Sequence, residues 1–281
     1  MKELTFRPGR PHDGFLRYPH ETKASRIAII IPACKEEACI APVLEELLAA
    51  LDPAKYIVAV GVNDSSDRTA EIARQFRVCV IETAARGYGH GCRDAIEAVT
   101  CVAPAVSAFV FFAADGASDP RDIATLVAAH ERGAKMVLGA RTTRRSNWAA
   151  MTFPHVLANV ALGLWCGLLT GRWFADLGPL RLIDRRLFET IAPREMTFGW
   201  TIEAQVGAAM LGANICEVSV HERRRIAGEQ KVSGVTWRRT FNIGCRILAA
   251  GWRARSRFSS RAAERPATAA RPVVAQGQSS A

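Results

Sequence analysis

The sequence predicts an α/β fold, with an open, mostly parallel sheet that carries helices on both of its faces. Between residues 26 and 140, short apolar runs alternate with segments of helical pattern, which is typical of parallel strands linked by right-handed crossovers. The apolar runs are continuous rather than alternating, as expected for strands covered on both faces. The chain has 281 residues, of which 49% are hydrophobic, so it is large enough to enclose such a sheet in a core.

The best defined strand is expected at 108–112, which reads AFVFF and runs into an acidic turn at Asp115. A helix is expected to begin at Asp119 and Pro120, because aspartate favours the helix cap and proline the first helical position. The other strands of this half are expected at 26–32, 56–62, 78–81 and 135–139. Helices are expected at 37–51, 68–76, 92–99 and 120–132, with a glycine-rich loop at 87–91 before the third.

Beyond residue 140 the segments become more apolar. The stretch 148–173 contains an apolar core at 156–170, which is short for a membrane span and is expected to form a buried or interfacial helix. A strand with a short helix is expected within 176–191, followed by a helix at 200–211 and a strand at 215–220. A last, amphipathic helix is expected at 236–258, with an apolar side made of Ile243, Ile247, Leu248 and Trp252.

These elements predict four parts of the chain: a flexible arm at 1–24, the main domain at 25–234, a basic amphipathic helix at 235–260 and a disordered tail at 261–281. The formal net charge is +10, and residues 235–261 hold seven arginines and no acidic residue. Such a helix predicts an anionic partner, and an anionic membrane surface is favoured over a merely solvated face. Nucleic acid is not expected, because the aromatic residues of this segment do not interleave with the arginines as a stacking platform would.

Several classes of protein are disfavoured. The eight cysteines are scattered without a C-x-x-C pair, which argues against a zinc site or a disulfide framework and fits a reducing cytoplasm. The N-terminal segment has no apolar signal core, so the expected location is cytoplasmic, with peripheral attachment to the inner face of the membrane. The first strand is followed by no glycine-rich loop, and no Walker motif occurs, which disfavours dinucleotide enzymes, nucleotidyltransferases and P-loop ATPases.

Three carboxylates follow three expected strands at the point where each strand ends: Glu36, Asp64 and Asp115. Since the carboxyl ends of parallel strands meet at one sheet edge, we expect these side chains to line one pocket. Carboxylates accept hydrogen bonds from a base or ribose, or hold a divalent cation against a diphosphate. Three downstream cations, Arg141, Arg225 and Lys231, are suited to neutralising phosphate. The alternative for Asp115 is an ordinary turn residue.

The motifs occur in an order that resembles glycosyltransferase family 2, and most of all its dolichol-phosphate-mannose-synthase-like branch. The resemblance covers roughly residues 25–250 and rests on the segments IIIPACKEE, VNDSSDRTAEIA, GYGHGCRDAI, FFAADGASDP, VLGAR, DLGPLRLI, FGWTIEAQ and RIAGEQKVSG. It implies a GT-A fold and an inverting transfer of sugar from a nucleotide-diphosphate sugar, usually with Mg²⁺ or Mn²⁺. The implied acceptor is a polyprenyl phosphate or another lipid.

The resemblance also implies roles for single residues. Asp115 matches the second aspartate of the D-x-D metal motif. Asp176 and Glu203 match acidic positions near the acceptor, and either could act as a base. Alternatively, Asp176 only stabilises its turn, and Glu203 is the buried partner of an arginine. The residues implied at the nucleotide sugar are Pro32, Ala33, Cys34, Glu36, Val62, Asp64, Ala114, Asp115, Arg141, Arg225 and Lys231. The first aspartate of D-x-D is Ala113 here, which leaves the need for metal open. A catalytically impaired protein that binds nucleotide sugars is therefore the alternative function.

Overall fold

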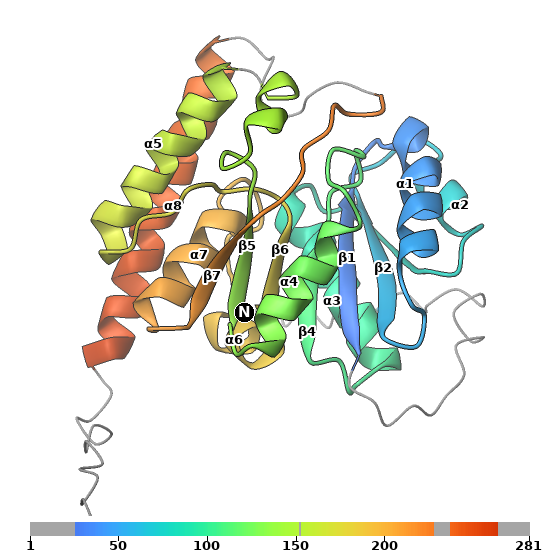
Figure 1. Cartoon of the computed structure of the whole chain (residues 1–281), viewed down its shortest axis with the longest axis horizontal. Helices are drawn as coiled ribbons and strands as arrows, with labels where there is room; N and C mark the ends of the chain where they lie inside the picture. The colour runs from blue at the N-terminus through green and yellow to red at the C-terminus, as the bar shows by residue number, and fades with distance from the viewer. Residues whose placement is uncertain (1–25, 152, 228–236, 264–281) are drawn as a thin grey trace, which may run out of the picture.

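A computed structural model describes residues 26–151, 153–227 and 237–263, and over these ranges it forms one sheet with helices on both faces (Figure 1). The sheet has seven strands in the order β3-β2-β1-β4-β6-β5-β7 within this part of the chain. Neighbours are parallel except at β6, which lies antiparallel between β4 and β5. The strands are β1 (Ile27–Ala33), β2 (Tyr56–Asn63), β3 (Cys79–Thr83), β4 (Ala108–Phe111), β5 (Met136–Ala140), β6 (Arg181–Asp184) and β7 (Ile215–Ser219).

The continuous apolar runs are explained by two cores, one on each face of the sheet. Alternate residues of β1 and β4 enter different cores: Ile30 and Phe111 face one, while Ile29 and Val110 face the other. Helices α1 (Glu37–Ala50), α2 (Thr69–Ala73) and α4 (Asp122–Glu131) cover the second core. The first core is covered by α3 (Tyr88–Val102), α5 (Phe153–Thr170), α6 (Arg185–Ile191), α7 (Trp200–Met210) and α8 (Trp237–Ala263). The predicted α/β class with a mostly parallel sheet is confirmed.

The glycine-rich loop expected at 87–91 is wrong in its extent, because α3 begins at Tyr88 and takes up two of the three glycines. Their lack of side chains serves packing. Gly91 of α3 lies directly against Gly61 of β2, and a Cβ added to Gly61 would overlap the Gly91 carbonyl group. Gly91 thus allows the close approach of α3 to the sheet, whereas a Cβ at Gly89 would overlap Met196 and Trp200, so both glycines serve packing.

We expect Gly61→Ala to lower the free energy of unfolding by about 1–3 kcal/mol, because the added methyl forces α3 away from β2. The matched control is Gly244→Ala in α8, where an added Cβ meets nothing within 4 Å. Alanine should there be neutral or stabilising, as in other helix interiors. Urea unfolding of both variants checks this, and equal effects at the two positions would disprove the packing explanation.

Helix α8 differs from its expected pattern. Ile243 is buried as predicted, but the helix packs on α7 and α5 through Ala250, Ala254 and Phe258. Leu248 and Trp252, expected on the same apolar side, are instead 38% and 57% exposed. Small alanines allow the close approach to α7, and this contact turns Leu248 and Trp252 outward. The helix also continues to Ala263, past the expected end at 258.

The arm expected at 1–24 and the part of the tail after Ala263 lie outside the described residues. The helix expected at 156–170 is present as α5, which lies beside α8 at one edge of the molecule (Figure 1). Among the described helices, none is both long enough and apolar enough to cross a membrane.

Candidate functional site

The turns after β1 and β4 meet at one edge of the sheet, and an arginine joins their carboxylates. Glu36 follows β1 and Asp115 follows β4, and these strands are parallel neighbours. The Arg225 guanidinium donates from Nη2 to Glu36 Oε2 at 3.0 Å and from Nη1 to Asp115 Oδ2 at 3.2 Å. Two of the three expected carboxylates are thus held together by one of the expected cations.

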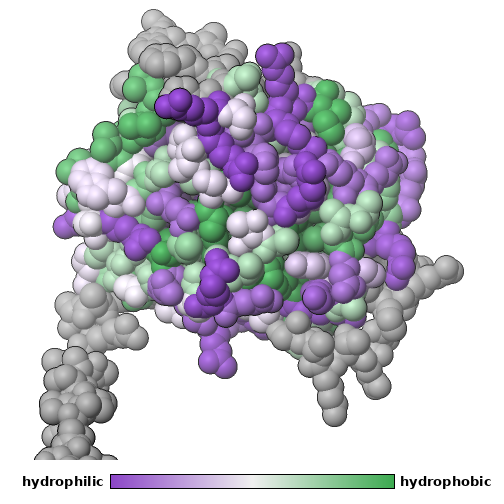
Figure 2. Space-filling model, in the orientation of Figure 1, coloured by the Kyte–Doolittle hydropathy of each residue, from purple (hydrophilic) through white to green (hydrophobic). Residues whose placement is uncertain are grey.

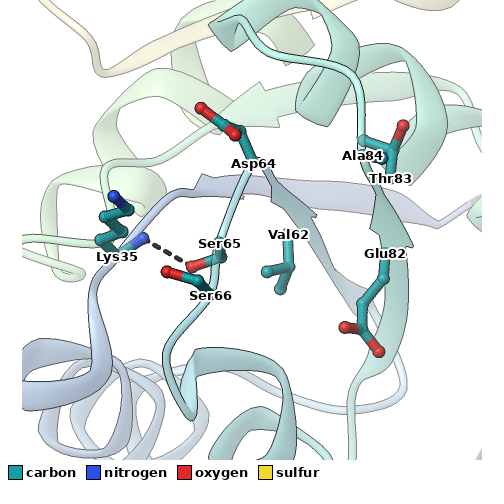
Figure 3. A pocket seen from close by; sticks show the side chains of 8 residues that line it. All are labelled: Lys35, Val62, Asp64, Ser65, Ser66, Glu82, Thr83 and Ala84. Carbon is teal, nitrogen blue, oxygen red and sulfur yellow. Dashed lines mark hydrogen bonds between the residues drawn. The ribbon is translucent and has the colours of Figure 1, made fainter.

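The third carboxylate, Asp64, lies in a neighbouring cavity of about 390 Å³ (Figure 3). The cavity is formed by the ends of β1, β2 and β3. It is lined by Lys35, Val62, Asp64, Ser65, Ser66, Glu82, Thr83 and Ala84. The lining residues from the end of β3 were missed by sequence reasoning, because the strand order that places β3 beside β2 could not be assigned from the sequence alone. The cavity has a polar rim and an apolar floor at Val62, and this combination suits a nucleobase.

The loop after β1 is fixed to the loop after β2 by backbone hydrogen bonds. The backbone N–H of Lys35 donates to Ser65 Oγ at 2.7 Å, and that of Glu36 donates to Thr69 Oγ1 at 3.0 Å. Lys35 and Asp64 both have positive φ, 55° and 47°, a conformation that costs free energy in residues other than glycine. The hydrogen bonds therefore hold the cavity wall in a defined, strained shape.

Asp67 organises this wall. Its carboxylate accepts from the Ser65 and Thr69 hydroxyls, both at 2.7 Å, and from the backbone N–H of Glu37 at 3.1 Å. Burial works against its charge, but these hydrogen bonds hold the pKa of Asp67 below its usual range. Asp67, just before the start of α2, therefore joins the loop after β1 to the loop after β2.

The remaining residues implied at the nucleotide sugar lie along the same edge. Cys34 is half-buried and its Sγ lies 3.6 Å from the Asp64 carbonyl oxygen. Pro32 is half-buried, whereas Ala33, Val62 and Ala114 are buried, so Ala33 and Ala114 shape the edge through their backbone. Lys231 lies outside the described residues.

Arg141 is buried in a network of acidic residues. Its Nε and Nη2 donate to the two carboxylate oxygens of Asp176 at 2.7 and 2.9 Å, and its Nη1 donates to Glu222 Oε1 at 3.2 Å. Burial disfavours its charge, yet the bonds to Asp176 keep the pKa of Arg141 above its ordinary value. All three guanidinium nitrogens are therefore committed to carboxylates, and we infer that Arg141 supports the site rather than contacting phosphate itself.

Glu222 was missed by sequence reasoning, because a glutamate next to a run of arginines is expected at the surface. The structure buries it beside Arg141, at the start of the loop that carries Arg225. Burial raises the pKa of Glu222 to about 7, and the nearby Asp115 carboxylate adds to this while Arg141 opposes it. The one sequence signal that could have pointed to Glu222 is its place after β7, next to the basic loop.

Glu203 makes its described contacts on the other face, away from Arg225 and Asp115. Its Oε2 accepts the backbone N–H groups of Arg194 and Glu195 at 2.8 and 2.7 Å, and its Oε1 accepts from Arg257 Nη1 at 2.7 Å. Both oxygens are thus occupied, and the side chain is 7% exposed. Of the two roles considered for Glu203, this geometry favours the buried partner of an arginine over the base.

We expect Glu203→Gln and Arg257→Ala to lower the free energy of unfolding, each by about 1–3 kcal/mol, because both break a charged hydrogen bond. Sugar transfer per folded molecule should stay within twofold of the parent in both. Chemical unfolding beside an activity measurement checks this. Loss of transfer in Glu203→Gln alone, with stability unchanged, would restore the catalytic assignment.

The loop at 221–227 is docked onto the site by backbone bonds. The N–H of Arg223 donates to the Ala117 carbonyl at 2.7 Å, and that of Ile226 donates to the Asp115 carbonyl at 3.1 Å. The Arg223 guanidinium also pairs with Glu46 of α1 at 2.8 Å. The loop after β7 therefore covers the edge where β1 and β4 end and brings Arg225 to their carboxylates.

Comparisons with known proteins agree on one family. The sequence matches glycosyl transferase family 2 over residues 28–191. It is 30% identical over 211 residues to an uncharacterized glycosyltransferase of Mycobacterium tuberculosis, covering 74% of this chain and 90% of that protein. It is 31% identical over 209 residues to a dolichyl-phosphate hexose transferase of Haloferax volcanii, covering 73% and 86%.

Solved structures show the same fold. Glucosyl-3-phosphoglycerate synthase of M. tuberculosis, in complex with Mn²⁺, UDP-glucose and glycerol 3-phosphate, superposes with a TM-score of 0.62. The match covers 83% of this chain and 81% of that one at 17% identity. The same synthase has been solved with UDP, Mn²⁺ and glucosyl-3-phosphoglycerate, with a TM-score of 0.60. The GT-A expectation for the fold is thereby confirmed.

Proposed function

The chain belongs to glycosyl transferase family 2 and is a glycosyltransferase, and we propose that it moves a sugar from a nucleoside-diphosphate sugar to a polyprenyl phosphate. The observation that carries the donor is the adjacency of two features at one sheet edge. The cavity that holds Asp64 suits the base, and the Glu36–Arg225–Asp115 cluster beside it suits the diphosphate. The relative that binds UDP-glucose, at a TM-score of 0.62, supports this choice of donor.

A divalent cation fits the residues at this edge. Asp115 is half-exposed, and the buried Oε2 of Glu222 has no hydrogen-bond partner among the described residues. No three potential ligands cluster anywhere in the described residues, so the diphosphate would have to supply further oxygens. Mg²⁺ or Mn²⁺ bound there would neutralise charge on the departing diphosphate. Arg225 would share this task, since its guanidinium lies at the same carboxylates.

The choice of acceptor rests on the two carboxylates implied as bases, Asp176 and Glu203, and on their contacts in the described structure. Attack by a hydroxyl group needs a base to take its proton, but Asp176 and Glu203 are both committed to arginines. The second pKa of a phosphate monoester is about 6, so the phosphate is already an anionic nucleophile at neutral pH. An acceptor phosphate therefore fits this site better than a sugar hydroxyl, in line with the dolichyl-phosphate relative.

A lipid acceptor also fits the surface. Leu157, Val160, Leu164 and Leu168 recur every three or four residues along α5 and are exposed, with Leu168 reaching 67%. Figure 2 shows hydrophobic side chains along this edge of the molecule. Helix α8 packs beside α5, exposes Leu248 and Trp252, and carries arginines without acidic residues. We propose that this apolar edge rests on an anionic membrane surface, where apolar burial and charge attraction combine.

We expect the chain to sediment with vesicles containing phosphatidylglycerol and much less with neutral phosphatidylcholine vesicles. Leu168→Glu should weaken binding to the anionic vesicles at least about tenfold, because it places a charge in the apolar edge and repels the anionic surface. Equal sedimentation of the variant and the parent protein would argue against this edge as the contact.

The proposed transfer is tested with radiolabelled UDP- and GDP-sugars and a polyprenyl-phosphate lipid extract. The parent protein should yield labelled, chloroform-extractable product, and Asp115→Asn should reduce the rate about 100-fold. Asp52→Asn, at an exposed turn after α1, is the matched control and should transfer normally. Nucleotide-sugar binding without any transfer would instead favour a catalytically impaired binding protein. That alternative is suggested by Ala113, which stands in place of the first aspartate of the D-x-D motif.

A further inference from the structure

Glu222 carries a buried carboxylate oxygen that no described group satisfies. Its side chain is 10% exposed, and its Oε1 accepts a hydrogen bond from Arg141. Its Oε2 is inaccessible to solvent and has no hydrogen-bond partner in the described structure. A buried acceptor left without a partner costs free energy, so such an atom is a place where a ligand is expected.

This oxygen lies at the turn that carries Asp115. Glu222 forms an isolated antiparallel bridge with Ser118, three residues after Asp115. The next residues of its loop are bonded to the same turn, through Arg223 to Ala117 and through Ile226 to Asp115. The turn that carries Asp115 and the loop that carries Glu222 are therefore joined through their backbones, and Glu222 Oε2 has no hydrogen-bond partner in the described structure.

The backbone of Glu222 is fixed as firmly as its side chain. Its N–H donates to Asn147 Oδ1 at 3.0 Å, and the amide group of Asn147 donates to the carbonyls of Arg141 and Val220, both at 2.8 Å. Asn147 is itself buried. The glutamate is therefore preorganised, which a ligand to a cation requires.

We propose that Glu222 supplies the second carboxylate of the divalent-cation site, in place of the aspartate that Ala113 lacks. The inference rests on the proposed function, because the diphosphate of the donor must complete the ligand set. Hard cations such as Mn²⁺ and Mg²⁺ prefer carboxylate and phosphate oxygens. In this arrangement the carboxylate that acts together with Asp115 comes from the loop after β7 instead of the turn after β4. Metal binding is expected to depend on a bound nucleoside diphosphate, since two carboxylates alone are a weak site.

The test follows free Mn²⁺ by electron paramagnetic resonance, in the presence of saturating UDP or GDP. Glu222→Gln keeps the shape and the acceptor for Arg141 but loses the charge, and it should weaken Mn²⁺ binding at least about tenfold. Glu217→Gln is the matched control, since Glu217 lies on β7 and its carboxylate accepts the backbone N–H groups of Ala175 and Asp176. It should bind Mn²⁺ like the parent protein.

A rescue variant makes the test specific. Adding Ala113→Asp to Glu222→Gln returns a carboxylate to the turn after β4, and Mn²⁺ affinity should recover to within a few-fold of the parent protein. Unchanged Mn²⁺ binding in Glu222→Gln, or no Mn²⁺ binding by the parent protein with nucleotide bound, overturns the inference while the nucleotide site stands. Failure of the parent protein to bind any nucleoside diphosphate would instead overturn the proposed function.

Discussion

Arg225→Ala is expected to lower kcat for sugar transfer about 100-fold while leaving the fold intact. The guanidinium joins Glu36 and Asp115 and is partly exposed, so it is placed to move onto a diphosphate that enters beside them. Removing one preorganised group that stabilises developing charge typically costs about 10²–10³ in rate. Steady-state transfer measured over a range of donor concentrations separates this loss from weaker binding.

The neighbouring Arg224 provides the control. It is exposed and carries the same charge one residue earlier. Arg224→Ala should transfer at nearly the parent rate, and Arg225→Lys should keep part of the activity because it retains the charge without the forked geometry. If Arg225→Ala transferred sugar as fast as Arg224→Ala, Arg225 would be only a structural partner of the two carboxylates.

Asp176→Ala is expected to lower the free energy of unfolding by about 3–5 kcal/mol, because it leaves the buried Arg141 charge without its bidentate partner. Glu222 would remain as a partner through one hydrogen bond only. Urea unfolding, followed by circular dichroism, gives the change in free energy directly.

The paired replacement Arg141→Met with Asp176→Leu separates charge from packing. No charge then remains buried at Asp176 or Arg141, and Glu222, whose pKa is already raised to about 7, becomes neutral by taking up a proton once Arg141 is gone. The double variant should therefore be more stable than Asp176→Ala. A wild-type stability for Asp176→Ala, accompanied by loss of sugar transfer, would contradict the structural role and favour Asp176 as a base.

The sheet and its acidic edge could be predicted because they rest on local signals. Continuous apolar runs identify strands buried on both faces, and residues such as Glu36 and Asp115 stand where those runs stop. Parallel neighbours then share an edge whatever the details of packing. Arg225 was predicted to neutralise phosphate from its place in a basic segment, and the structure shows it paired with both carboxylates.

What could not be predicted depends on contacts between distant segments. Arg141 meets Asp176 across 35 residues and Glu222 across 81, so no local pattern reveals that all three of its guanidinium nitrogens donate to carboxylates. The face of α8 was misjudged for a similar reason. Periodicity marks Leu248 and Trp252 as apolar, but packing against α7 selects the small alanines instead.

The proposed function requires a nucleoside diphosphate to bind across the ends of β1, β2 and β4, with its base by Asp64 and its phosphates by Arg225. Calorimetric titration of UDP and GDP, in the presence of Mn²⁺, measures this most directly. We predict saturable one-to-one binding of at least one of them to the parent protein and to Arg224→Ala, and binding weaker at least about tenfold in Asp64→Ala and Arg225→Ala. Heat of binding that is absent for both nucleotides, or identical in all four proteins, would contradict it.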